Sequence, residues 1–308
     1  MKSAAIGIFD SGLGGLTVAR EIARALPAES LVYLGDTARC PYGPRDQSEV
    51  RRYVIEIGSW LAEQRIKFLV IACNTATAAG LTLAQRAFPV PVLGVIEPGA
   101  RAAVMATRNR RVGVIGTVGT IESGAYSRAV RALDAGVTVF SATTPRFVEI
   151  VEEGLRLDTG PMEGLIADSA DVFVRPSFYE IARDYLDPLK RSGIDTLVLG
   201  CTHYPLLSAS IQQVVGRRVQ LISSARETAR EIAETLARRD QLVPEGAKPR
   251  YRFATTGDAD EFERLGSRVF AAPIGAVETV GLDELVALPG AQVLALMDDP
   301  ATKETSCA

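Results

Sequence analysis

Short apolar runs alternate with longer amphipathic stretches along most of the chain, and this rhythm limits the possible folds more than any other feature. The runs are rich in β-branched residues, and a polar or glycine-rich turn and a helical pattern follow nearly every one. Such βα units build a parallel sheet. The expected strands lie at residues 4–9, 31–35, 68–72, 92–96, 112–116, 137–142, 196–200 and 219–223. Because ligands bind where the carboxyl ends of parallel strands meet loops, the residues just after each strand are the candidates for function.

A weak internal repeat divides this pattern into two halves. Residues 69–75 (LVIACNT) align with residues 197–203 (LVLGCTH), so each half ends a strand in a cysteine. Likewise, residues 6–15 have a counterpart in residues 112–120, where Thr117 falls close to the place of Asp10 or Ser11. The repeat predicts two similar domains whose strand-end loops meet at a cleft.

Composition and charge exclude several classes of protein. Of the 308 residues, 47% are hydrophobic and 23% are charged, which is typical of a folded globular chain. A formal charge of -3 leaves no basic surface for a nucleic-acid partner. The apolar runs are shorter than the roughly 18 residues that a membrane helix needs. The N-terminus has no complete signal-peptide core, so we expect a cytoplasmic protein.

The four cysteines have no CxxC pair, and His203 is the only histidine. We therefore expect free thiols and no zinc or other metal site. Cys73 and Cys201 each lie between a strand and a helix start, where the helix dipole and unpaired N–H groups should lower the pKa of a thiol. A lone cysteine at a strand end would most simply be a small buried hydrophobic residue. Two at equivalent places in a repeat favour a chemical role.

Several chemistries suit a reactive cysteine. Nucleophilic catalysis could pair Cys201 with His203, but it leaves Cys73 unexplained. Disulfide exchange usually uses a CxxC motif, which is absent. Proton transfer uses both thiols, because one base can remove a proton from one face of a carbon while the other returns a proton to the opposite face. The paired cysteines therefore indicate a racemase.

Polar residues after the strands supply groups that could bind an amino acid. Asn74, Thr75 and Thr202 suit a carboxylate held between the two thiols. Asp10 and Ser11 offer an anion and a hydroxyl to an ammonium group. Residues of these types after strands are also ordinary helix caps, and that interpretation stays open for each of them.

Two further segments near the N-terminus bear on the ligand. Backbone N–H groups of Tyr42 and Gly43 could bind a second carboxylate, although Pro-Tyr-Gly is also a common turn. The run DSGLGGL, with Asp36 ending the next strand, partly matches a dinucleotide-binding fingerprint, but Thr17 stands where its third glycine should be. Nucleotide binding is therefore disfavoured. Cys40 lacks strand context and is assigned no role.

Six strand-end motifs in order closely resemble those of the glutamate racemase family. They are DSGLGGLTV at 10–18, YLGDTARCPYG at 33–43, ACNTATA at 72–78, VIEPG at 95–99, VIGTVGTIESGAY at 114–126 and GCTHYPLL at 200–207. The resemblance covers most of the chain. It implies a cofactor-independent enzyme that interconverts L- and D-glutamate, supplies D-glutamate for peptidoglycan, and commonly forms a homodimer.

The resemblance also implies an α/β fold of two pseudo-symmetric domains, each with a mainly parallel sheet flanked by helices, and an active site at the domain interface. The first domain would comprise residues 1–98 and 208–308 and carry Cys73. The second would comprise residues 99–207 and carry Cys201, with an insertion near 155–176 that could be helical or a lid.

Roles for individual residues follow from the same resemblance. Cys73 would deprotonate D-glutamate with the help of Asp10, and Cys201 would deprotonate L-glutamate with the help of His203 and Glu152. The substrate-binding residues would be Asp10, Ser11, Tyr42, Gly43, Asn74, Thr75, Thr117, Thr120, Thr202 and His203.

Other functions remain as alternatives. Aspartate racemase, or a related isomerase with two cysteines, shares the plan, but His203 after the Cys-Thr pair favours glutamate, because the related enzymes usually carry an acidic residue there. A two-domain amino-acid sensor would close on its ligand without needing the thiols. A thiol-dependent hydrolase or transferase would form a covalent adduct on Cys201 alone.

Overall fold

The computed structural model describes residues 2–157 and 176–288, which form two parallel sheets. The first sheet has the order β10-β9-β2-β1-β3-β4 and the second has the order β6-β5-β7-β8. The first-sheet strands are β1 (Ile6–Asp10), β2 (Leu31–Gly35), β3 (Phe68–Ile71), β4 (Val92–Gly94), β9 (Tyr251–Thr255) and β10 (Val277–Thr279). The second-sheet strands are β5 (Arg111–Gly116), β6 (Thr138–Thr143), β7 (Thr196–Gly200) and β8 (Gln220–Ser223). All eight strands expected from the apolar runs are present, and the α/β class is confirmed.

The sheet orders repeat, as the sequence alignment of the two halves predicts. Strands β2-β1-β3-β4 of the first sheet correspond in order to β6-β5-β7-β8 of the second. Each central pair, β1 with β3 and β5 with β7, is parallel and in close register, with Phe9 opposite Ile71 and Gly116 opposite Gly200. The loops that carry the two cysteines therefore follow equivalent strands.

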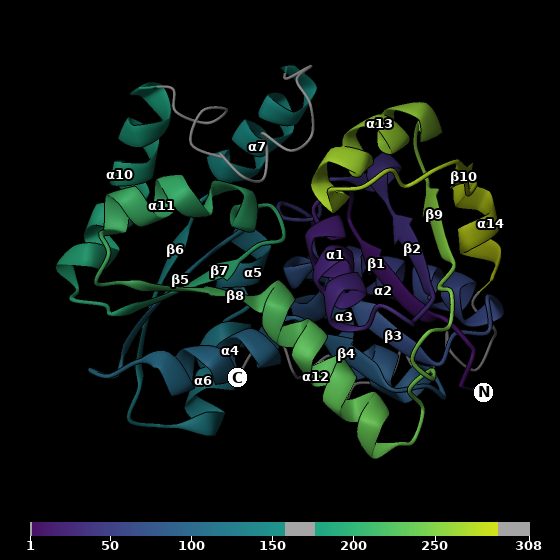
Figure 1. The fold of residues 1–308 in the computed structure, drawn as a ribbon. Helices are drawn as coiled ribbons and strands as arrows, with labels where there is room; N and C mark the ends of the chain where they lie inside the picture. The colour runs from purple at the N-terminus through teal and green to yellow at the C-terminus, as the bar shows by residue number, and fades with distance from the viewer. Residues whose placement is uncertain (1, 158–175, 289–308) are drawn as a thin grey trace.

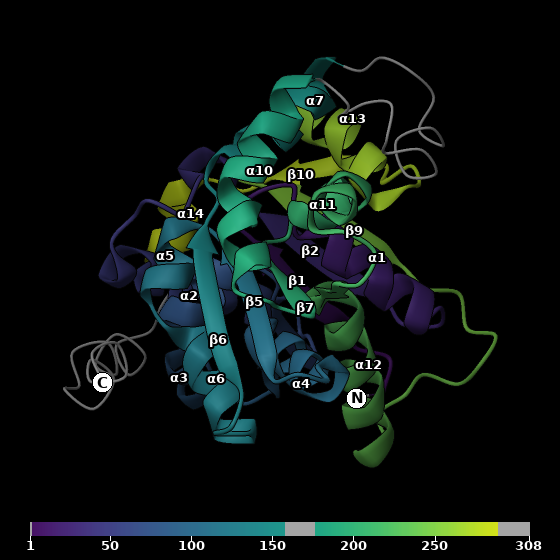
Figure 2. The same ribbon diagram turned by 90° about the vertical axis from the view of Figure 1, so that its left-hand side faces the viewer.

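Helices connect the strands and cover both faces of each sheet (Figure 1). The helices associated with the first sheet are α1 (Leu16–Ala25), α2 (Gln47–Glu63), α3 (Asn74–Ala87), α13 (Ala259–Phe270) and α14 (Leu282–Ala287), with the 3-10 turn η1 (Thr37–Arg39). The others are α4 (Ile96–Ala106), α5 (Val118–Glu122), α6 (Ala125–Leu133), α7 (Arg146–Leu157), α10 (Pro176–Arg191), α11 (Ser208–Val215) and α12 (Ser224–Arg238), with η2 (Tyr204–Leu207). Figure 2 shows the second sheet from its own side, with β6, β5 and β7 next to one another.

The alternation of side chains along β1 explains the two layers of the first sheet. Ile6 and Ile8 point into a core shared with α1 and α13, while Phe9 points into a second core shared with α2 and α3. The first of these cores continues through α7, α10 and α11 of the second sheet. The two halves are therefore joined by one continuous apolar core on that side.

The expected boundary at residue 207 does not match the sheets. It placed residues 208–308 with the first sheet, but β8 pairs with β7 in the second. The repeat explains this pairing. In the order β6-β5-β7-β8, strand β8 takes the place that β4 has in the order β2-β1-β3-β4 of the first sheet. Helix α12 then contacts both α1 and α4, and the chain returns to the first sheet at β9. The division into two domains as separate units stays a prediction.

Two further expectations concern the C-terminal half and the insertion. The strand, turn and helix expected after residue 245 are present as β9 and α13, and they extend the first sheet beside β2. The expected insertion at 155–176 falls almost wholly outside the described residues. Within the described part of the chain, no helix is long and apolar enough to cross a membrane.

Candidate active site

Cys73 lies at the carboxyl edge of the first sheet, between β3 and α3. It caps α3, and its Sγ accepts a hydrogen bond from the Ala76 N–H at 3.5 Å. The Ser11 hydroxyl lies 3.8 Å from the same sulfur. Asp10, which ends the neighbouring strand β1, is fully buried and accepts a 3.0 Å hydrogen bond from the Gly12 N–H. The pairing of β1 with β3 thus brings the predicted carboxylate and hydroxyl beside this thiol.

Cys201 occupies the equivalent place after β7 and is followed by the only histidine. Its Sγ lies 3.8 Å from Nδ1 of His203. On the other side of the ring, Nε2 of His203 lies 3.4 Å from Oε1 of Glu152 on α7. The structure therefore brings together the three residues that the resemblance assigns to this side.

Both thiols line a single cavity of about 230 Å³. Cys73 is 6% exposed and Cys201 is 7% exposed. The predicted binding residues that also line this cavity are Ser11, Tyr42, Gly43, Asn74, Thr75, Thr117, Thr202 and His203. A small molecule in this space would therefore contact sulfur from each half of the repeat.

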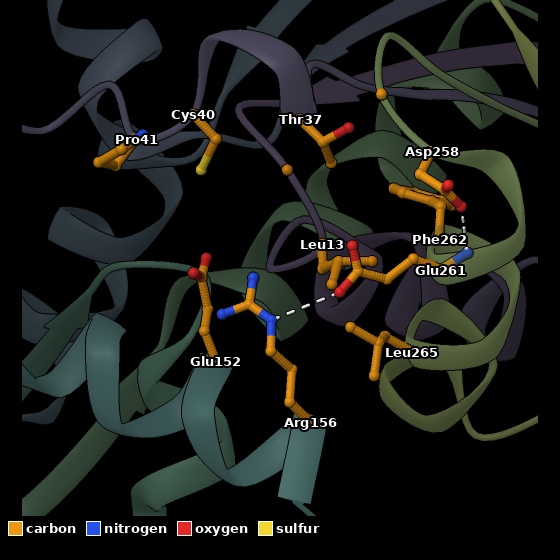
Figure 3. A pocket seen from close by; sticks show the side chains of 12 residues that line it. Leu13, Thr37, Cys40, Pro41, Glu152, Arg156, Asp258, Glu261, Phe262 and Leu265 are labelled. Atoms are coloured by element: carbon orange, nitrogen blue, oxygen red, sulfur yellow. Dashed lines mark hydrogen bonds and ion pairs between the residues drawn. The ribbon is translucent and has the colours of Figure 1, made fainter.

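Three predicted site residues do not line this cavity. Asp10 is buried behind it, where its Oδ1 accepts a 3.4 Å hydrogen bond from Thr202. Thr120 is buried against the hydroxyls of Thr75 and Thr117, at 3.3 and 3.0 Å. Glu152 faces an adjacent cavity of about 250 Å³ instead (Figure 3). In this structure these three residues contact the residues that line the cavity and do not line it themselves.

Sequence reasoning missed several residues of the cavity wall. Cys40 and Pro41 line both this cavity and the adjacent one, so they form part of the wall between them. Pro145, Val148 and Glu149 come from the start of α7 and the turn before it. The position of Cys40 two residues before Tyr42 was the available signal. In the α7 segment the family resemblance pointed only to Glu152, and the three wall residues gave no signal because tertiary packing alone brings them to the cavity.

Contacts between the two halves hold the cavity together. The Thr75 and Thr117 hydroxyls are 2.9 Å apart, and the Gly119 N–H donates to the Gly43 carbonyl at 2.9 Å. Gly14 packs directly on the turn after Cys201, since a Cβ there would lie 2.6 Å from Nδ1 of His203. The run of small residues after β1 therefore allows the two strand-end loops to approach each other.

The pKa of Cys73 contradicts the expectation drawn from the helix start. Burial, followed by the charge of Asp10, raises its pKa from 9.0 to about 12. The hydrogen bonds from Ala76 and Ser11 act in the opposite direction but are smaller effects. Desolvation of a charge is costly, and one backbone N–H does not offset it here. Cys73 is therefore held as a thiol.

The pKa of His203 is displaced in the direction that keeps the ring charged. Burial alone would lower it, but the hydrogen bonds and charges of Cys201 and Glu152 raise it from 6.5 to about 10. Burial also acts to raise the pKa of Glu152, yet the hydrogen bond and charge of His203 bring it below its ordinary value. An imidazolium held by a carboxylate thus faces one of the two thiols.

Asp36, which follows the strand after the glycine-rich run, makes only internal contacts among the described residues. It is fully buried and accepts hydrogen bonds from Arg39 Nε at 2.7 Å, from Thr256 at 2.8 Å and from the Tyr42 hydroxyl. Its role here is to hold the turn that carries Tyr42 and Gly43. No cluster of three His, Cys, Asp or Glu side chains able to bind a metal occurs among residues 2–157 and 176–288.

The comparisons with known proteins agree with this geometry. The profile of the Asp/Glu/Hydantoin racemase family matches residues 6–232. A glutamate racemase of Bacillus cereus is 47% identical over 281 residues, covering 91% of this chain and 98% of its own. The crystal structure of glutamate racemase isoform RacE1 from Bacillus anthracis is 42% identical, covers 92% of this chain and 99% of its own, and superposes with a TM-score of 0.82. A glutamate racemase from Francisella tularensis in complex with D-glutamate is 29% identical, covers 92% of this chain and 99% of its own, and has a TM-score of 0.80. The chain belongs to the Asp/Glu/hydantoin racemase family.

Proposed function

We propose that this protein is a glutamate racemase that interconverts L- and D-glutamate by two-base proton transfer without a cofactor. The observation that carries the proposal is that Cys73 and Cys201, from equivalent positions of a structural repeat, line one small cavity. The substrate follows from the relatives, since proteins 45–48% identical to this chain are named glutamate racemases. We also propose that the D-glutamate serves peptidoglycan synthesis.

The reaction needs one thiolate and one thiol. For L-glutamate, the Cys201 thiolate takes the α-proton, the electron pair of the C–H bond passes onto the α-carbon and its carboxylate, and the Cys73 thiol gives its proton to the opposite face. For D-glutamate the two sulfurs exchange roles. Each turnover leaves the proton on the other sulfur, so no other reactant is required. The imidazolium of His203, 3.8 Å from Cys201, would attract negative charge on that sulfur.

Polar groups around the thiols suit a bound amino acid. The amide nitrogen Nδ2 of Asn74 is buried with no hydrogen-bond partner in the described chain, although Oδ1 accepts from Tyr126 at 2.8 Å. A substrate carboxylate would satisfy that donor. An ammonium group near Ser11 would lie on the side of the buried charge of Asp10, which raises the pKa of Cys73. The positive charge of the bound ammonium group would therefore offset part of the negative charge of Asp10 and favour ionisation of the Cys73 thiol.

The test is to incubate the purified protein with each enantiomer of glutamate and, separately, of aspartate. Circular dichroism would follow the loss of optical activity, with no cofactor added. We expect racemisation of glutamate from either side and its loss in both Cys73→Ser and Cys201→Ser. The control is Cys40→Ser, because this third thiol lines the same cavity but has no part in the mechanism.

The possible results separate the alternatives. Activity on aspartate alone would move the assignment to aspartate racemase or a related isomerase. Activity that survives either serine substitution would refute the two-base scheme. A covalent adduct on Cys201 alone, detected by intact mass, would indicate a thiol-dependent hydrolase or transferase instead.

We further propose a cytoplasmic homodimer, on the strength of the family resemblance alone. Sedimentation equilibrium at micromolar concentration would test the dimer. Cell fractionation with a tagged chain would test the location.

A further inference from the structure

The C-terminal segment that follows the family match contacts the helix that carries Glu152. The family profile ends at residue 232, whereas α13 spans Ala259–Phe270. Helix α13 packs on α1 of the first sheet and also contacts α7. Figure 1 shows α13 and α7 facing each other across the top of the molecule. A helix beyond the residues matched by the family profile therefore contacts the helix that carries Glu152.

Among the described residues, a hydrogen bond and an ion pair join α13 to the end of α7. Arg268, only 5% exposed, donates from Nη1 to the carbonyl of Leu155 at 2.5 Å. Glu261 lies 3.4 Å from Nε of Arg156, and both of these side chains are about half exposed (Figure 3). Hydrogen bonds from a charged group in a buried setting are strong, whereas exposed ion pairs contribute little. Arg268 is thus the principal contact and the Arg156–Glu261 pair assists it.

These contacts fall within one helical turn of Glu152. Leu155 is three residues and Arg156 four residues further along α7, so fixing this turn fixes the backbone from which Glu152 projects. Glu152 reaches Nε2 of His203 at 3.4 Å, and Nδ1 of His203 lies 3.8 Å from Cys201. A continuous series of contacts therefore leads from α13 to one of the two sulfurs.

We infer that Arg268, assisted by Glu261, is a positioning residue for the Cys201 side of the reaction: it holds α7 so that Glu152 reaches His203. Among the described residues, no hydrogen bond or ion pair joins α13 to α3, which carries the Cys73 side. The inference rests on the proposed racemase function. It predicts that loss of Arg268 weakens one of the two proton transfers and not the other.

Isotope effects distinguish the two transfers. Glutamate deuterated at the α-carbon loses its deuterium to Cys201 when the substrate is L and to Cys73 when it is D. If the Cys201 step becomes slower, it limits the rate in both directions. The isotope effect on kcat/KM then rises for L-glutamate and falls for D-glutamate.

The variant is Arg268→Met, which removes the donor and keeps an apolar stem. We expect kcat/KM to fall about 10- to 100-fold, as a small misplacement of a supporting group does. The fall is equal in both directions because enantiomers have equal free energy, while the two isotope effects move oppositely. Arg268→Lys should restore part of the activity. A matched control is Arg20→Met, which removes an arginine-to-carbonyl bond from α1 to Val269 of α13, at 3.1 Å, and should leave both isotope effects unchanged.

A second variant covers the case in which Arg268→Met does not fold. Glu261→Arg opposes Arg156 with a like charge at an exposed position and should move the isotope effects in the same opposite directions, more weakly. Glu263→Arg makes the same charge change at an exposed site two residues along α13 and should not. Isotope effects that stay at the parental values in the folded variants, or that change alike for both enantiomers, would overturn the inference. A parent protein that does not racemise glutamate would instead refute the proposed function.

Discussion

Replacing Glu152 by glutamine should lower the pKa of His203, and the chain offers an unusually clean way to measure it. His203 is the only histidine among the 308 residues, so a labelled sample gives one imidazole signal. In the unaltered protein, burial would lower its pKa, but Cys201 and Glu152 raise it to about 10. Glutamine keeps the shape of the Glu152 side chain and removes its charge, 3.4 Å from Nε2.

The expected change follows from the charge that is lost. An opposite charge this close to a buried group shifts a pKa by about 1 to 3. The pKa of His203 should therefore fall from about 10 to between roughly 7 and 9 in Glu152→Gln. Each step of one in pKa corresponds to about 1.4 kcal/mol, so the carboxylate stabilises the imidazolium by about 1.4 to 4 kcal/mol.

The assay is a pH titration of the ¹⁵N-labelled ring, followed by NMR from pH 6 to pH 11. The control is Glu153→Gln, which removes the same charge from the next residue of α7, where the side chain is exposed. That substitution should leave the pKa of His203 close to its parental value. A His203 that titrates near 6.5 in the unaltered protein, or that is insensitive to Glu152→Gln, would refute this account of the Cys201 side.

Three further outcomes follow from the structure. The pKa of His203 is higher in the folded protein than its ordinary value, so the charged ring contributes up to about 5 kcal/mol to stability. This contribution is complete below pH 6.5 and is lost as the pH rises through 10. Urea unfolding measured across that pH range would detect the loss. Asp10→Asn removes a charge that raises the pKa of Cys73, so alkylation of that thiol at pH 8 should become about tenfold faster even as racemisation slows; an unchanged alkylation rate would mean that Asp10 exerts no such charge effect. Glu29→Gln leaves Lys67, 2% exposed and 2.5 Å from Glu29 Oε2, buried without its carboxylate, and should reduce the free energy of unfolding by about 3–5 kcal/mol, whereas a loss below about 1 kcal/mol would contradict the burial of this pair.

Much of the architecture was predictable because the apolar runs and turn residues act locally. The runs that end before Asp10 and Cys73 are strands in the structure, and the repeat between the cysteine segments corresponds to a repeated strand order. What the pattern could not give was strand partnership. The expected boundary at residue 207 separates β8 from β7, although the two strands pair, because such a long-range pairing has no local signal.

The candidate site divides in the same way. Residues directly after strands, such as Thr75 and Thr202, were found because parallel sheets place them at one edge. The pKa of Cys73 was not predicted correctly. A helix start lowers a thiol pKa and burial raises it, and which effect is larger depends on how deeply Cys73 lies in the fold. Cys40 was assigned no role, yet it lines the cavity. The chain after β2 brings Cys40 beside Gly12, in the loop that follows β1.

The most direct test of two opposed thiols is the fate of the α-proton in deuterated water. L-glutamate should be sampled before racemisation is complete, and the D-glutamate formed and the L-glutamate remaining should be analysed separately by mass spectrometry. Bases on opposite faces predict deuterium in nearly every product molecule and almost none in the remaining substrate. Product that retains the original proton, or substrate that gains deuterium as fast as product forms, would show that a single base serves both faces and would contradict the pairing of Cys73 with Cys201.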